Sequence, residues 1–180
     1  MKAPAFSFAK LSGMDAYLSP EMKSTGEAIG YDKTLQRAAY KAMIASGLTL
    51  KNYGTVVVSV ADEDKEEALP LVRRFYNLGF NIEATTSTGE YLKRHGIRTR
   101  IRHKSSEGSE EILDAIRSGY VSYVINTRAV LSSIHTGDGT EIRCCAAQNH
   151  VSMFTSLDTV KILLDVLEEV TIGISTIDGK

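Results

Sequence analysis

The chain has 180 residues, of which 43% are apolar, so it can bury one substantial core and suits one domain with an appendage better than two full domains. Its formal net charge of −1 argues against general nucleic-acid binding, which needs a strongly basic face. No apolar run approaches the ~18 residues of a membrane span, and no signal-peptide pattern opens the chain.

Cysteine and histidine usage indicates the compartment and the absence of a metal site. The two cysteines, Cys144 and Cys145, are neighbours, and vicinal pairs rarely form structural disulfides. The histidines occur singly, without metal-ligand spacing. We therefore expect a cytoplasmic protein in a reducing setting, with no metal and no membrane association.

Residues 1–48 differ from the remainder of the chain. Residues 2–30 have apolar positions in unconnected patches, and the string LSPEMKSTGE has neither a helical nor a strand period, so this segment is predicted to be loop. A helix is predicted over 33–46, with Gly47 as its stop signal. These residues cannot form a core alone, so they must pack on the following domain or on a partner.

From residue 50 onward, apolar strands alternate with amphipathic helices. The strand 55–60 is a β-branched run of the kind buried on both faces in a parallel sheet. The predicted strands cover 55–60, 79–84, 98–103, 120–126 and 151–154, and the predicted helices cover 65–78, 89–95, 110–118, 141–150 and a last helix to about 169, with a polar connection at 129–140. This pattern predicts an α/β fold, a three-layer Rossmann-like parallel sheet of about five strands with helices on both faces.

The run from Thr85 to Gly89 consists of small hydroxyl residues and glycine between a strand and a helix. The first amide groups of a helix lack intrahelical partners and carry positive partial charge, so such a turn can bind an anion. An equally weighted alternative is that Thr85 or Ser87 only caps the helix.

In parallel sheets, ligands gather beyond the carboxyl ends of the strands. The predicted strand ends carry two lysines, an arginine, hydroxyls and an amide, with few carboxylates; they are residues 62–65, 85–88, 103–104, 126–128 and 155. This composition predicts a pocket for a phosphorylated ligand.

The ordered motifs resemble the C-terminal part of the large subunit of carbamoyl phosphate synthetase over nearly the whole chain. LSPEMKSTGEAIG (18–30) is similar to the segment that closes the second ATP-grasp synthetase unit, and 34–46 is similar to the linker after it. The residues that follow resemble the allosteric domain, whose fold is shared with methylglyoxal synthase. The resemblance implies two parts, a synthetase tail with its linker helix (1–48) and a methylglyoxal-synthase-like allosteric domain (49–180).

The resemblance also implies the effector-binding residues, for a nucleotide such as UMP or IMP. Lys65 matches a nucleotide-contacting lysine, and Thr85 and Thr88 match the two threonines of the phosphate turn. Lys104 matches the lysine after the third strand, and Asn126 matches the asparagine of the INT string.

Several positions depart from the family pattern. Arg128 replaces a threonine, and its added positive charge could favour a more highly phosphorylated effector such as phosphoribosyl pyrophosphate. Of the family's ornithine site only Thr155 matches, while Met153 and Phe154 replace more polar neighbours, which argues against ornithine control.

The resemblance implies a regulatory module without catalytic residues or cofactors of its own. ATP and Mg²⁺ would bind in synthetase units absent from this sequence. Its partners would be the remainder of the large subunit and the glutaminase small subunit, and the full enzyme would be a homo-oligomer.

Two alternatives remain open. One is a methylglyoxal-synthase-like lyase, although the GGDQQ-like string of its carboxylate base is missing, and Asp62 and Asp64 fit solvated loop acids better. The other is an interaction module with a vestigial pocket.

Overall fold

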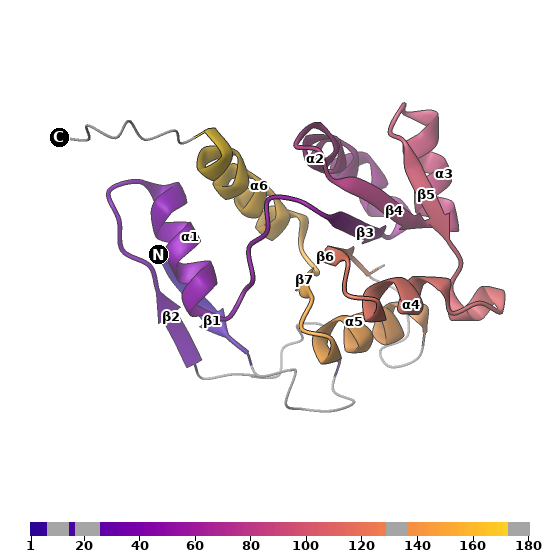
Figure 1. Ribbon diagram of the computed structural model, residues 1–180, viewed down its shortest axis with the longest axis horizontal. Coiled ribbons are helices and arrows are strands. Elements are labelled where there is room, and N and C mark those ends of the chain that lie inside the picture. Colours follow the sequence, from indigo (N-terminus) through magenta and orange to yellow (C-terminus); the bar gives the residue numbers. More distant parts are fainter. Residues whose placement is uncertain (7–14, 17–25, 129–136, 173–180) are drawn as a thin grey trace.

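The computed structural model describes residues 1–6, 15–16, 26–128 and 137–172. Its centre is a parallel sheet of five strands in the order β5-β4-β3-β6-β7 (Figure 1). The strands are β3 (Thr55–Ser59), β4 (Asn81–Thr85), β5 (Thr99–Arg102), β6 (Val121–Asn126) and β7 (Ser152–Phe154). All five predicted strands and their parallel pairing are confirmed.

Helices cover both faces of the sheet, as predicted. They are α2 (Lys65–Asn77), α3 (Thr86–Arg94), α4 (Glu111–Arg117), α5 (Asp138–Gln148) and α6 (Leu157–Ile172). Helices α2, α3 and α6 lie on one side of the sheet and α4 and α5 on the other (Figure 1). Because successive strand residues point to opposite faces, Val56 and Val58 pack in the core under α2, α3 and α6, whereas Val57 packs under α4 and α5.

Two helix starts differ from the prediction. Helix α3 begins at Thr86, so the hydroxyl residues form its first turn rather than a separate loop before Gly89. Helix α5 begins at Asp138, inside the connection predicted to extend to residue 140. Two short 3₁₀ helices, η2 (Asp62–Asp64) and η3 (Ser105–Glu107), follow β3 and β5.

The N-terminal residues contain a second, antiparallel sheet of β1 (Lys2–Ala5) and β2 (Gly26–Ile29). The prediction of loop over 2–30 was wrong for these strands, because pairing between residues about 25 positions apart stabilises two short segments that carry no period of their own. Most of the LSPEMKSTGE string lies outside the described residues.

The predicted linker helix is α1 (Leu35–Ala45), capped by the Thr34 hydroxyl, which accepts a hydrogen bond from the Arg37 amide. It lies against α6 and beside the small sheet (Figure 1). Met43 of α1 is 4% exposed and belongs to the larger core cluster of the α/β domain. The linker helix therefore packs on the following domain, one of the two arrangements expected for it.

Tyr123 anchors the centre of the larger core. Its ring contacts those of Phe75, Phe80 and Phe154, with centroids 5.8 to 6.1 Å away. Its hydroxyl accepts a hydrogen bond from the Lys51 amide (2.7 Å) and donates one to the Lys51 carbonyl (2.6 Å). Burial raises the pKa of Tyr123 to about 12. Among the described helices, none is long and apolar enough to cross a membrane.

Candidate functional site

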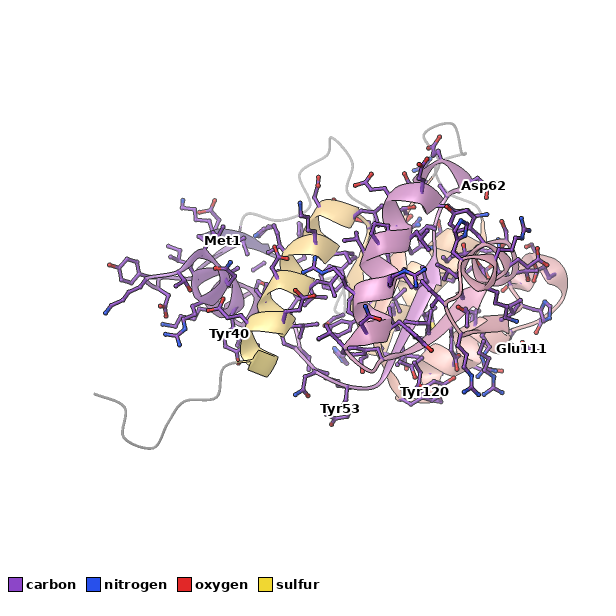
Figure 2. The ribbon with its side chains drawn as sticks, turned by 90° about the horizontal axis from the view of Figure 1, so that it is seen from above. Met1, Tyr40, Tyr53, Asp62, Glu111 and Tyr120 are labelled. Carbon is purple, nitrogen blue, oxygen red and sulfur yellow. The ribbon has the colours of Figure 1, made fainter. Side chains whose placement is uncertain are left out.

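The carboxyl-terminal ends of β3, β4, β5 and β6 meet at one edge of the main sheet, called the carboxyl edge below. Figure 2 shows Asp62, which follows β3, on the opposite side of the molecule from Tyr53 and Tyr120, which precede β3 and β6. Five of the predicted site residues lie along the carboxyl edge: Lys65 at the start of α2, Thr85 and Thr88 at the start of α3, Lys104 two residues after β5, and Asn126 at the end of β6.

Both threonines of the predicted phosphate turn are buried. The Thr85 hydroxyl donates to Thr88 Oγ1 (3.3 Å) and to Ser59 Oγ (3.5 Å), and Thr88 Oγ1 accepts from the Val60 amide (3.4 Å). Thr85 occupies the N-cap position of α3, but its side chain makes no capping hydrogen bond. The alternative that Thr85 serves only as a helix cap is therefore wrong; its hydroxyl ties the ends of β3 and β4 together.

Lys65 reaches from α2 to the first turn of α3. Its ammonium group donates to Ser87 Oγ and forms an ion pair with Asp62 Oδ1 at 2.6 Å. The Lys65 side chain is 13% exposed and that of Asp62 is 87% exposed. The hydrogen bond and charge of Lys65 lower the pKa of Asp62, and a bond from Ser87 and the charge of Lys104 add to this effect.

Lys104 lies at the other side of α3, with its ammonium group 3.5 Å from Asp138 Oδ2 at the start of α5. The Ser106 amide and hydroxyl donate to the same carboxylate at 2.9 and 2.6 Å. Burial alone would raise the pKa of Asp138, but the bonds from Ser106 and the charge of Lys104 outweigh it, so the pKa is lowered. Asp138 therefore stays ionised at neutral pH.

Asn126 is held by a residue that the sequence analysis missed. Arg143 of α5 is 3% exposed, and its Nη1 donates to Asn126 Oδ1 at 2.6 Å. Asn126 Nδ2 donates in turn to the Ser59 carbonyl at 3.3 Å. Asp15, from the N-terminal residues, accepts two hydrogen bonds from Arg143 at 2.6 Å. Nothing in the local string EIRCC distinguishes this arginine from a solvated helix residue, since its partners come from distant parts of the chain.

The structure corrects the predicted charge balance of the edge. Few carboxylates were expected, yet several lie there. Four of them are beside a basic side chain: Asp15 beside Arg143, Asp62 beside Lys65, Glu107 beside His103, and Asp138 beside Lys104. Burial would raise the pKa of Glu107, but hydrogen bonds from Thr86 and His103 and from the Lys104 amide lower it. The edge thus holds carboxylates beside its basic side chains and is not a purely cationic pocket.

Arg128 lies in a neighbouring hollow of about 260 Å³, which it lines together with Thr127 and Thr155. Three carboxylates line the same hollow, those of Asp64, Glu67 and Asp158. Arg128 therefore has acidic neighbours from α2 and α6, whereas the other five predicted residues lie at the ends of β3, β4, β5 and β6.

A larger cavity of about 1040 Å³ lies elsewhere, along β4 and β5, with Thr55, Asn81 and Arg98 among its lining residues. It contains none of the six predicted site residues. We favour the carboxyl edge because charged groups, hydroxyls and a helix start converge there. The described part of the chain holds no group of three side chains suited to a metal ion.

Residues 67–155 match the family model of the MGS-like domain. The parallel α/β sheet with helices on both faces is thus an MGS-like fold, in agreement with the fold expected from the sequence.

A solved structure of a methylglyoxal synthase has the same class of fold. A methylglyoxal synthase from Elizabethkingia anophelis NUHP1 superposes with a TM-score of 0.54 at 17% sequence identity, covering 64% of this chain and 79% of that one. The structure of ForH matches with a TM-score of 0.48 and 17% identity, over 64% of this chain and 80% of that chain. At these identities the likeness concerns the fold alone.

Proposed function

We propose that this protein is a regulatory domain that binds a phosphorylated effector at the carboxyl edge. The observation that carries the proposal is the strand order β5-β4-β3, which places Lys104 after β5 and Lys65 after β3 on either side of the start of α3, which follows β4. The charges of Lys65 and, to a smaller extent, Lys104 both act on Asp62. A phosphate placed there would receive amide hydrogen bonds from the helix start and two charge-assisted bonds from lysine.

The carboxylates at the edge are compatible with such a ligand. Asp62 is 87% exposed, so it can turn into solvent when a dianionic phosphate takes its place beside Lys65. We propose that Arg128, in the neighbouring hollow, faces a second phosphate of the effector. Asn126, which is buried and bonded through both amide atoms, would hold the end of β6 in position beside the ligand.

The parent enzyme that we propose is glutamine-hydrolysing carbamoyl phosphate synthetase, with this chain as the allosteric end of its large subunit. UMP, IMP or phosphoribosyl pyrophosphate would be the effector, and the controlled product would serve arginine or pyrimidine synthesis. An effector that binds one arrangement of the large subunit more tightly shifts the equilibrium by that difference, typically ~1–3 kcal/mol. ATP and Mg²⁺ would act in the synthetase units, not in this chain.

A lyase acting on dihydroxyacetone phosphate is the second candidate, and the carboxylates at the edge favour it. Asp62 and Asp138 each lie beside a lysine that a substrate phosphate would approach, and such a lyase needs a carboxylate as general base. The MGS-like fold is compatible with either role.

Calorimetric titration of the purified chain with UMP, IMP and phosphoribosyl pyrophosphate tests the regulatory proposal. We expect saturable binding of at least one of them and no formation of methylglyoxal from dihydroxyacetone phosphate. Turnover of that substrate would establish the lyase instead. An absence of both binding and turnover would leave the interaction module with a vestigial pocket.

A further inference from the structure

The contact between Asp15 and Arg143 has the geometry of carboxylate recognition. Arg143 Nε donates to Asp15 Oδ1 and Nη2 donates to Asp15 Oδ2, each at 2.6 Å, which is the parallel two-bond arrangement that guanidinium groups form with carboxylates and phosphates. Thr140 also contributes, because its hydroxyl bonds to Asp15 Oδ2 at 3.2 Å. Both charged side chains are largely buried, with 3% and 14% of their surfaces exposed.

This ion pair connects directly to the carboxyl edge. The remaining arm of the guanidinium group, Nη1, holds Asn126 at the end of β6, and Asn126 bonds to the Ser59 carbonyl at the end of β3. Ser59 in turn accepts from Thr85, the first threonine of the candidate phosphate turn. Hydrogen bonds therefore join Asp15 to the start of α3 through the side chains of Arg143, Asn126 and Thr85, with Ser59 contributing both its carbonyl and its hydroxyl.

Close packing keeps this chain of contacts in place. Gly139 lies so near that a Cβ atom there would stand 3.1 Å from Arg143 Nη1 and 3.5 Å from Asn126 Oδ1. Its neighbour Asp138 is the partner of Lys104. The start of α5 thus brings the Arg143 pair beside the second lysine of the edge.

We propose that Asp15 is an internal anion that competes with the phosphorylated ligand for the positive charge of Arg143. Ligand binding at the carboxyl edge and the Asp15 contact would then oppose each other. By thermodynamic linkage, the ligand would loosen the N-terminal residues to the same degree that Asp15 weakens ligand binding. This inference rests on the proposed function, and it assigns a coupling role to two residues outside the predicted site.

The chain carries its own reporter for the contact. Cys144 is half-buried and follows Arg143, and the pKa of its thiol is raised first by burial and then by the charge of Asp15. Loss of the Asp15 charge from this position should therefore increase the thiolate fraction and the rate of modification of Cys144. The only other cysteine in the sequence is Cys145, which is buried.

The experiment compares the full chain with its Asp15→Asn variant, which keeps the side-chain shape and removes the charge. Affinity for phosphoribosyl pyrophosphate and UMP is measured by calorimetry. The rate of Cys144 modification by a disulfide reagent is measured in a Cys145→Ala background, with and without each compound. We expect Asp15→Asn to bind the ligand about fivefold or more tightly, at the lower end of common coupling energies. We also expect Cys144 to be modified faster in Asp15→Asn than in the parent chain without ligand, because the carboxylate charge that raises the pKa of the thiol is lost.

Two controls separate this coupling from a loss of folding. Asp165→Asn removes a carboxylate that pairs with Arg74 at 2.6 Å between α6 and α2, and it should leave both readouts unchanged. In a Cys144→Ser variant, any acceleration seen at Cys145 would indicate general opening of the domain.

The outcomes distinguish the two proposals. If a compound binds but Asp15→Asn changes neither its affinity nor the rate at Cys144, the coupling is refuted while the proposed function survives. If neither compound binds the parent chain or the variant, the proposed function fails, and this inference fails with it.

Discussion

Lys104 is the residue whose proposed role can be tested most directly. Its ammonium group pairs with Asp138 at 3.5 Å, a length that leaves room for a better anionic partner. Replacing Lys104 with Ala should weaken effector binding by roughly 1–3 kcal/mol, the cost of losing a charge-assisted bond.

Calorimetry with the effector that binds the parent chain gives the measurement, and Arg98→Ala is the matched control. Arg98 is an exposed basic residue that lines the larger cavity instead of the carboxyl edge, so its loss should have little effect. Equal affinities for the parent chain and Lys104→Ala would remove Lys104 from the site.

The ion pair of Asp15 and Arg143, unlike the lysines and threonines of the site, could not be predicted from the local sequence. The lysines and threonines stand at strand ends, where the alternating pattern already predicts convergence. The partners in the ion pair are 128 positions apart, and Asp15 belongs to a segment without periodicity. Only the folded chain brings these two charges together.

Among the helices, α3 determines the shape of the candidate site, and Gly89 determines how closely α3 approaches the sheet. A Cβ atom at Gly89 would lie 2.8 Å from Ile101 Cγ1 and 3.6 Å from the Ala84 side chain. Gly89→Ala should therefore force α3 away from β4 and β5, with a loss of stability of about 1–3 kcal/mol, the usual range for overpacking.

Urea denaturation measures the loss of stability. Calorimetric titration with the effector that binds the parent chain should also show a weaker affinity, because the first turn of α3 moves. Glu90→Ala is the control, because it changes the exposed neighbouring position of α3. It tests whether any substitution in this helix lowers stability and affinity in the same way. Undiminished stability in Gly89→Ala would contradict the close approach of α3.

The helices and strands also show which parts of the fold can be predicted from the hydrophobic periodicity of the sequence. Each strand and α-helix that the structure describes after residue 50 was predicted, because a buried parallel strand and an amphipathic helix each leave a regular pattern. The short 3₁₀ helices η2 and η3 were not predicted. The starts of α3 and α5 were placed too late, since Thr86, Ser87 and Asp138 are typical of turns as well as of first helical turns. Strands β1 and β2 were missed because each depends on its distant partner.

For the molecule as a whole, the main question is whether residues 1–48 and 49–180 unfold together. Met43 of α1 is 4% exposed within the core of the α/β domain, so the two predicted parts share buried surface. Met43→Ala should lower the free energy of unfolding by about 2–5 kcal/mol, as for other buried methionines, and shift a single transition.

Circular dichroism and tyrosine fluorescence, followed in the same urea series, provide the measurement. Tyr40→Ala is the comparison, because this side chain of α1 is 39% exposed and its loss should change stability far less. Two separate transitions would mean that the linker helix unfolds independently of the α/β domain.

The burial of Tyr123 has a spectroscopic consequence. The sequence has eight tyrosines and no tryptophan, so phenolate absorbance reports on the tyrosines alone. With its pKa raised from 10.0 to about 12, Tyr123 keeps its proton in the folded chain at pH values where the unfolded chain has released it. The free energy of unfolding therefore falls progressively as the pH rises from 10 to 12. Below pH 10 the Tyr123 hydroxyl does not change it. In an alkaline titration, the late rise in phenolate absorbance should coincide with unfolding. It should be smaller in Tyr123→Phe, where Tyr120, whose pKa burial also raises, still contributes.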